Sequence, residues 1–165
     1  MTPLAADLLV LFRRDLHCFI REVEAFPDDA MLWRTVPGLC NSVGNLALHV
    51  AGNLRLLVGA ALGGTGYQRD REQELNQREG ARADVAAALE GAAREVETGL
   101  KAVTAESLAA PFPMAVGGHQ PPTGRFLVHL AAHLAFHLGQ AGYLRRTLTG
   151  DATSTGAMAI KELMP

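Results

Sequence analysis

Apolar residues recur every three or four positions along four long segments of the chain, and this period predicts amphipathic α-helices. The four segments span residues 4–26, 42–62, 81–103 and 123–148. No segment shows the two-residue alternation, bounded by turns, that predicts a β-strand. The pattern therefore predicts an all-α fold. Four helices of about 20 residues, each about 30 Å long, favour a four-helix bundle.

The predicted helices are bounded by residues that start or stop helices for identifiable reasons. Asn41 or Ser42 is expected to cap the second helix, because a short polar side chain can accept a hydrogen bond from the free N–H groups of a first turn. The glycines of segment 63–66 are expected to end it, and Gly150 is expected to end the fourth helix. Segment 111–122 is rich in proline and glycine and is expected to be a loop.

About eighteen residues separate the second helix from the third. This connection is longer than an antiparallel turn in a bundle needs. It therefore favours a long crossover that joins two parallel neighbours. We expect residues 1–150 to form one helical domain and residues 151–165 to form a polar C-terminal tail with at most one short helical turn.

Composition narrows the class of protein. With 165 residues, 48% of them hydrophobic, the chain is expected to fold around one core. A formal net charge of −2 and the lack of a basic stripe argue against a nucleic-acid partner. We find no targeting segment and predict no membrane-spanning run, so a cytoplasmic protein is expected. Cys18 and Cys40 form no motif and are expected to be free thiols.

The first candidate functional residues lie in the fourth predicted helix, whose sequence over residues 126–146 is FLVHLAAHLAFHLGQAGYLRR. His129, His133 and His137 recur every fourth residue, so each neighbouring pair lies on one helix face and could share an ion. His129 and His137 are about 12 Å apart along the axis, too far to share one. On a helical wheel His137 falls inside the apolar arc and His133 at its edge. The pair His133/His137 is therefore the inward one.

The second predicted helix supplies a third candidate ligand. In NSVGNLALHVAGNLRLL, His49 lies beside an apolar face, with Asn45 and Asn53 one turn before and after it. A polar seam beside a leucine face is unusual for packing alone, because buried polar groups need partners. An ion coordinated by His49, His133 and His137, together with its waters, would satisfy several of these groups at once.

Three neutral imidazoles with no fourth protein ligand suit a divalent cation that keeps open positions for water or substrate. Zinc or nickel is expected, although affinity order alone does not choose among metals that accept imidazole. Asn45, Asn53 and Gln140 are candidates to orient ligands or water near the ion. The alternative for these three amides is that they only satisfy one another across the bundle.

The segments NSVGNLALHVAGNLR and HLAFHLGQAGYLRR together resemble the DinB-like superfamily of bacterial four-helix proteins. The resemblance covers most of the chain, and it implies a divalent metal held by His49, His133 and His137. His129 lies outside the motif. Some relatives are transferases or isomerases that use a low-molecular-weight thiol such as mycothiol, bacillithiol or glutathione. Segment 67–75 is similar to a connection in some relatives, and on its composition it is expected to be a solvated charged loop.

The leading functional hypothesis is a metal-dependent S-transferase, in which a small thiol, bound to the ion as thiolate, attacks an electrophile. Its partners would be a small-molecule substrate and the thiol, and no catalytic residue is assigned. The alternatives are a hydrolase that uses metal-activated water and a non-catalytic metal-binding stress-response protein, which could form a homodimer. The hydrolase lacks an Asp or Glu within a turn of the histidines. Arg145 and Arg146 are interpreted as a solvated helix end or as a carboxylate anchor.

Overall fold

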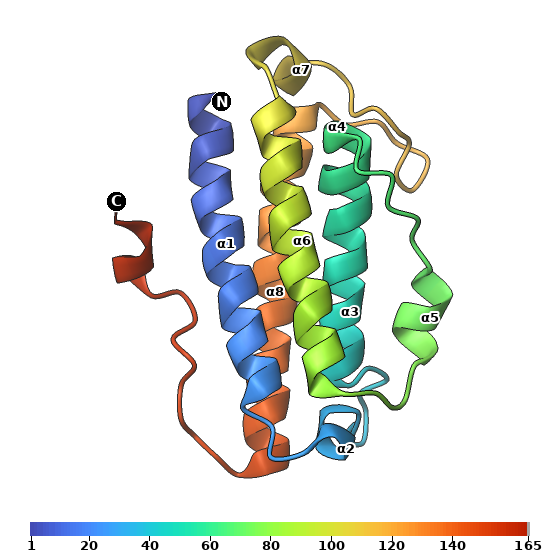
Figure 1. The fold of residues 1–165 in the computed structure, drawn as a ribbon, viewed down its shortest axis with the longest axis vertical. Helices are drawn as coiled ribbons and strands as arrows, with labels where there is room; N and C mark the ends of the chain where they lie inside the picture. Colours follow the sequence, from blue (N-terminus) through green and yellow to red (C-terminus); the bar gives the residue numbers. More distant parts are fainter. Residues whose placement is uncertain (165) are drawn as a thin grey trace.

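The computed structural model describes residues 1–164, and four long helical rods lie side by side in it (Figure 1). The rods are α1 (Pro3–Glu24); α3 (Val43–Leu54) continued by the π-helix η1 (Arg55–Ala60) and α4 (Ala61–Gly63); α6 (Arg82–Ala102); and α8 (Thr123–Thr149). Shorter helices are α2 (Asp29–Leu32), α5 (Arg71–Asn76), α7 (Ala105–Ala109) and the 3-10 helix η2 (Ile160–Leu163). Within residues 1–164 there are isolated bridges but no strand, so the all-α prediction is confirmed.

The direction of each rod follows from Figure 1. Helices α1 and α8 run from the top of the view to the bottom, whereas α3 and α6 both run upward. The chain between α4 and α6 therefore returns along the outside of the bundle, and it carries α5 on the way. This return path brings α5 against α3, close to the level of His49.

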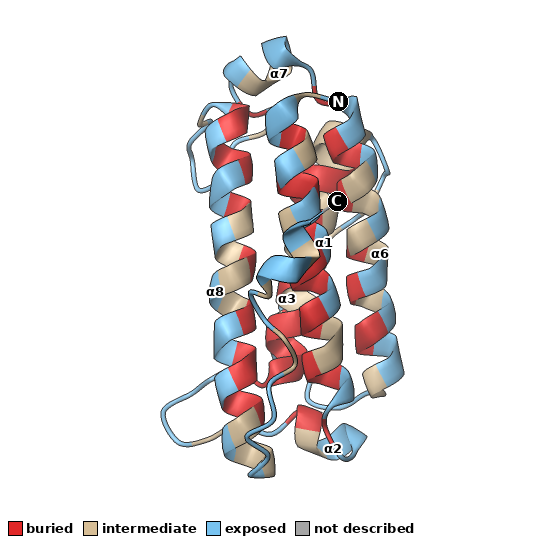
Figure 2. Cartoon of the chain, turned by 90° about the vertical axis from the view of Figure 1, so that its left-hand side faces the viewer, coloured by how far each residue is buried: buried red, intermediate tan, exposed pale blue. Residues whose placement is uncertain are grey.

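The core lies where the rods face one another. Buried positions form stripes on the inward sides of α1, α6 and α8 (Figure 2). Burial of each large apolar side chain contributes about 1.5–3 kcal/mol, so these stripes supply the main free energy that holds the rods together. The largest fully buried apolar side chains are Phe12, Phe19, Phe26, Phe112, Leu16, Leu32, Leu54, Leu89, Leu100, Leu127 and Leu130.

The predicted helix boundaries are confirmed where capping chemistry sets them. The Ser42 side chain accepts a hydrogen bond from the Asn45 backbone N–H, and the Asn45 side chain accepts one from the Ser42 backbone N–H. This reciprocal pair is a capping box, and it starts α3. Gly64 and Gly150 adopt left-handed conformations, with φ of 65° and 70°, at the ends of α4 and α8. Glycine takes this conformation without a Cβ clash.

The π-helical turn of η1 packs closely against α6. A Cβ on Gly99 would lie 2.1 Å from the carbonyl oxygen of Val58, so any larger residue would push the two backbones apart. A π-helical turn widens one turn of a helix, and such turns often lie near functional sites. Here it begins less than two turns after His49 and meets α6 at Gly99.

The C-terminal segment is held against α1 by a buried ionic group. The Arg145 guanidinium is 1% exposed and pairs with Glu22, while its other nitrogens donate to the backbone oxygens of Asp151 and Thr153. Thr155 Oγ1 donates to the second oxygen of Glu22. The interpretation of Arg145 as part of a solvated helix end was therefore wrong, because the partner acid lies 123 positions away on α1.

The rod that carries His49 also corrects one sequence prediction. Val43–Gly63 spans 21 residues and reaches a mean hydropathy of 1.4, so by length and composition it could cross a membrane, contrary to the expectation that no run is long enough. A core helix meets the same two criteria. Half of this apolar window is buried inside the bundle, against α6 and α8.

Candidate metal centre

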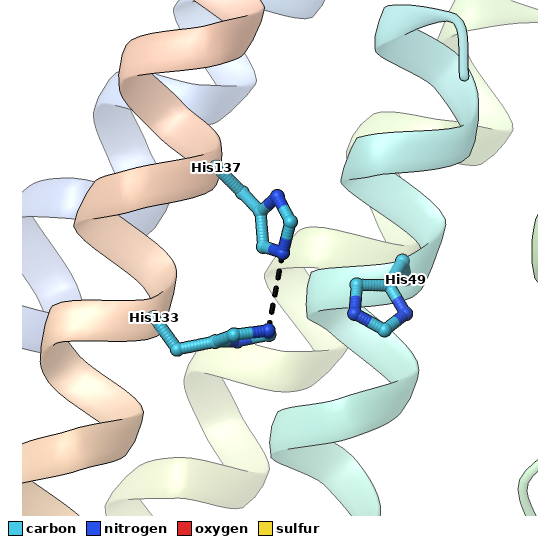
Figure 3. Close-up of side chains that lie close together, drawn as sticks. All are labelled: His49, His133 and His137. Carbon is cyan, nitrogen blue, oxygen red and sulfur yellow. Dashed lines mark hydrogen bonds between the residues drawn. The ribbon is translucent and has the colours of Figure 1, made fainter. Parts of the chain in front are cut away.

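The imidazoles of His49, His133 and His137 converge between α3 and α8 (Figure 3). Each contributes one ring nitrogen to a group whose members all lie within 4.8 Å of one another. His133 Nε2 and His137 Nε2 are 3.1 Å apart. All three residues are partly buried, and the His49 side chain is only 15% exposed. The structure thus brings together the three residues that the sequence pattern selected.

Helix geometry explains which histidines meet. His133 and His137 are one turn apart on α8, so their side chains lie on one face, and His49 projects towards them from α3. His129 is one turn earlier on α8 than His133, but its ring centroid lies 6.3 Å from that of His133 and it stacks on Phe126 instead. His129 is exposed and lies outside the ligand group, which agrees with the selection of His133/His137 as the inward pair.

The spacing of the nitrogens suits a single cation. Two nitrogens that are each about 2.1 Å from one tetrahedral ion lie about 3.4 Å apart. The His133–His137 pair, at 3.1 Å, is close to this separation, and because all pairs lie within 4.8 Å, the widest pair needs an approach of at most about 1.4 Å. The hydrogen bond between the two Nε2 atoms requires one proton between them, and a cation can take the place of that proton. These residues therefore fit a divalent metal.

The protonation state of the imidazoles also favours a cation. Burial lowers the pKa of His133 to about 4, and the neighbouring His137 and His49 add to this effect. Burial lowers the pKa of His137 as well, although its hydrogen bond with Gln140 opposes the shift. At neutral pH both rings are uncharged, which is the form that binds metals.

Gln140 orients the ring of His137. Its Oε1 lies 2.7 Å from His137 Nδ1, so the amide oxygen accepts the Nδ1–H proton and leaves the Nε2 lone pair free. Of the three amides chosen from the sequence, Gln140 is the one that contacts a candidate ligand directly. Its interpretation as an orienting residue agrees with this contact.

Sequence reasoning missed a charged pair behind His49. Glu74 Oε2 lies 3.6 Å from His49 Nδ1, and Arg69 Nη2 lies 3.1 Å from the same nitrogen. Because both groups are at Nδ1, the nitrogen of His49 that faces the other rings in Figure 3 is Nε2. When Nε2 binds an ion, the ring proton must reside on Nδ1, where the Glu74 carboxylate is the acceptor. Arg69 then remains bound to Glu74 and to the backbone oxygen of His49.

The Glu74 carboxylate is held in its charged form. Burial by itself would raise its pKa, but hydrogen bonds from Arg69 and His49 outweigh burial and bring the pKa below the ordinary value. Arg69 donates to both carboxylate oxygens, from Nε at 2.8 Å and from Nη2 at 2.7 Å. A fixed carboxylate behind a ligating imidazole raises the basicity of that imidazole and fixes its tautomer.

The position of α5 depends on two small features of α3. Asn45 Nδ2 donates to the backbone oxygens of Glu74 and Gln77, each at 2.9 Å, and thereby ties α5 to α3. A Cβ on Gly52 would lie 1.9 Å from Glu74 Oε1, so only glycine leaves room for this carboxylate. Asn45 therefore acts on the site through α5, since its own amide is fully used by these bonds and the capping box.

Two further sequence expectations can be placed on the structure. Segment 67–75 was predicted to be a solvated charged loop. Residues 68 and 70–73 are exposed, as expected, but the prediction was wrong for Arg69 and Glu74, whose side chains are only 12% and 7% exposed, and for residues 71–75, which lie in α5. Arg69 and Glu74 pair with each other beside His49. Asn53 contacts no ligand: its Oδ1 is buried, with no hydrogen-bond partner among the described residues.

Replacing Glu74 with glutamine is expected to weaken binding of Zn²⁺ about tenfold to 100-fold, the usual effect of losing an outer carboxylate. The amide keeps the shape of the side chain but removes the charge that stabilises the Nδ1 proton of His49. Competition with a chromophoric chelator measures the affinity. Glu72→Gln is the matched control, because Glu72 lies on the same short helix and is exposed. Equal affinity of the two variants would show that Glu74 does not support His49.

Comparison with known proteins gives one result that bears on this geometry. No curated protein matches the chain significantly in sequence. The family model of the DinB superfamily matches residues 11–141, a range that includes α1 from residue 11 onward, α3, α6 and the part of α8 that carries His133 and His137. Because the match covers most of the 165 residues and all three candidate ligands, the chain belongs to the DinB superfamily.

Proposed function

We propose that this DinB-superfamily protein is a metal-dependent S-transferase that joins the sulfur of a small thiol to an electrophilic substrate. The observation that carries the proposal is the group of three inward imidazoles on α3 and α8. Within the described residues this group contains no carboxylate or cysteine, so a divalent ion bound there would keep positions open.

The metal would supply one chemical effect. A divalent cation lowers the pKa of a thiol that it binds, so that the sulfur is present as thiolate at neutral pH. Zinc or nickel suits three imidazoles and sulfur together. The protein's part is to hold neutral imidazoles in place, with Gln140 and Glu74 fixing the protons of His137 and His49 on the nitrogens that face away from the centre.

The sulfur would come from a separate molecule. Cys18 is buried on α1, where its Sγ lies 3.3 Å from Thr155 Oγ1, and Cys40 is exposed before α3. Neither thiol belongs to the ligand group. A low-molecular-weight thiol such as mycothiol, bacillithiol or glutathione would reach the open positions from solvent.

The transfer step balances without an oxidant or reductant. The thiol gives its proton to solvent, its sulfur forms a bond to an electrophilic carbon, and the leaving group departs with the electron pair of the broken bond. The three histidines and their partners act by positioning and by charge, which is the larger part of catalysis in many displacement reactions.

A hydrolase has less support from the site. Glu74 is the acidic side chain that contacts a candidate ligand, but it is held by Arg69 and meets His49 on Nδ1. A general base for water must reach the attacking nucleophile at the open positions. The location of Glu74 behind His49 suits an orienting role instead.

The test measures thiol consumption. Protein purified without a histidine tag is loaded with Zn²⁺ or Ni²⁺ and mixed with each thiol and chlorodinitrobenzene, from which the thiol displaces chloride. We expect product formation well above the uncatalysed rate with the loaded protein, and none above that rate after chelation or in His49→Ala. The same preparations are also tested for hydrolysis of a model ester without thiol.

Each outcome separates the alternatives. Metal-dependent acceleration with at least one thiol supports the transferase. Loaded protein that accelerates neither reaction contradicts it and favours a non-catalytic metal-binding protein. Ester hydrolysis that needs the metal but no thiol contradicts it in favour of the hydrolase.

A further inference from the structure

A hollow of about 400 Å³ lies beside the metal centre, between segment 36–41 and the second half of α8. We call it the α8 pocket. Its volume is within the range of small-molecule sites. Its lining includes Leu39, Cys40, Leu46, His137, Gln140 and Thr147.

The α8 pocket reaches the candidate ligands directly. His137 lines it, and so does Gln140, whose amide holds the Nδ1 proton of that histidine. A molecule in the pocket therefore lies against one of the three imidazoles. Because Gln140 binds Nδ1, the pocket approaches His137 from the side of the ring that faces away from the ligand group, and the imidazole alone separates the end of the pocket from an ion bound at Nε2.

The lining selects an uncharged ligand. Val36, Leu39, Leu46 and Leu144 supply apolar surface, while Asn41 and Thr147 are polar but neutral. No Lys, Arg, Asp or Glu lines the pocket, so a charged ligand group held away from the His137 end would lose water without gaining a partner of opposite charge. The opposite hollow near α5 is different, since it is lined by Arg55, Asp70 and Glu74.

Apolar side chains at the rim are left exposed. Leu39 is 51% exposed, and Tyr143 is 75% exposed on α8. Segment 36–41 turns at Gly38, whose φ of 88° allows the chain to fold back over α8. A ligand in the pocket would remove part of this apolar surface from water, which favours binding in proportion to the area covered.

We propose that the α8 pocket binds the electrophile, a small, uncharged and largely apolar molecule, with its reactive carbon towards His137. This inference rests on the proposed S-transfer, in which the thiol sulfur forms its bond to that carbon and the leaving group takes the electron pair. The pocket thereby determines the class of substrate, whereas the histidines determine the chemistry.

The test begins with binding, which needs no turnover. N-phenylnaphthylamine, a neutral apolar fluorophore, is titrated into wild type, Leu39→Asp, Thr147→Arg and Val128→Asp. Val128 is 49% exposed on α8 and does not line the pocket, so its variant is the matched control for Leu39. We expect at least tenfold weaker binding in the two pocket variants and unchanged binding in Val128→Asp. Circular dichroism checks that all three are folded.

Alkylation of cysteine locates the bound probe. Cys40 lines the pocket and is exposed, whereas Cys18 is buried and serves as an internal control for unfolding. Saturating fluorophore is expected to slow alkylation of Cys40 by iodoacetamide severalfold. If binding is equal in all variants, or if Cys40 stays fully reactive in the presence of bound probe, the pocket assignment is wrong.

Failure of this inference can be told apart from failure of the proposed function. Zinc content is measured in every variant, and Leu39→Asp is expected to keep it, because Leu39 is outside the ligand group. If transfer to chlorodinitrobenzene persists unchanged in Leu39→Asp and Thr147→Arg, the S-transferase stands and the pocket is excluded. If the probe binds as expected but no thiol reacts, the pocket stands as a binding site and the S-transferase is excluded.

Discussion

Replacing His137 with alanine is expected to reduce bound Zn²⁺ from about one ion per chain to near zero after dialysis. His137 is the candidate ligand that also lines the α8 pocket, and its loss leaves one imidazole on each of two helices. Apparent free energies of zinc binding of about 10–16 kcal/mol are shared among three or four ligands, so one ligand corresponds to about 2.5–5 kcal/mol, a loss of roughly 100- to 10,000-fold in affinity. Elemental analysis of untagged protein measures the content.

His129→Ala is the matched control for this change. It removes an imidazole from the same helix, two turns away, but from a residue that is exposed and outside the ligand group. Its zinc content is expected to equal that of wild type. Unchanged metal in His137→Ala, or equal losses in both variants, would show that the ion is bound elsewhere.

The site residues that could be identified from the sequence are those whose positions depend only on neighbours within the same helix. The i, i+4 spacing of His133 and His137 places them on one face of any helix, and the apolar stripe of α8 tells which face is inward. The same reasoning works for His49 on α3, and for the capping box at Ser42 and the glycine that ends α8 at Gly150. These features need only the geometry of one helix.

The residues that sequence could not identify depend on the path of the chain. Arg69 and Glu74 are 20 and 25 positions from His49 and reach it only because the return segment packs on α3. The one local indication of this contact was Gly52. A glycine inside an apolar helix indicates that another part of the chain packs closely against it, but it does not identify that part. A charged segment is predicted to be solvent-exposed unless the residues that pair with its charges are known. For Glu74 those residues are Arg69 and His49.

Arg145 was wrongly interpreted as part of a solvated helix end for the same reason, and its replacement is the second change for which we expect a large effect. Arg145→Ala is expected to lower the free energy of unfolding by about 3–5 kcal/mol, because it leaves the buried Glu22 carboxylate without its cation. For a domain of this size the loss corresponds to a fall in Tm of roughly 6–20 °C. Thermal unfolding of the metal-free protein, followed by circular dichroism, measures the change without a contribution from metal binding.

Two further variants isolate the cause of that loss. Arg146→Ala removes the neighbouring guanidinium, which is only partly buried and donates to the Gly142 carbonyl, and its effect is expected to stay within about 1 kcal/mol. The double variant Glu22→Gln/Arg145→Met removes both buried charges, so it is expected to recover most of the stability that Arg145→Ala loses. If the double variant is as unstable as Arg145→Ala, the cost lies in the lost packing and in the released segment 151–155, whose backbone Arg145 holds, rather than in the unpaired carboxylate.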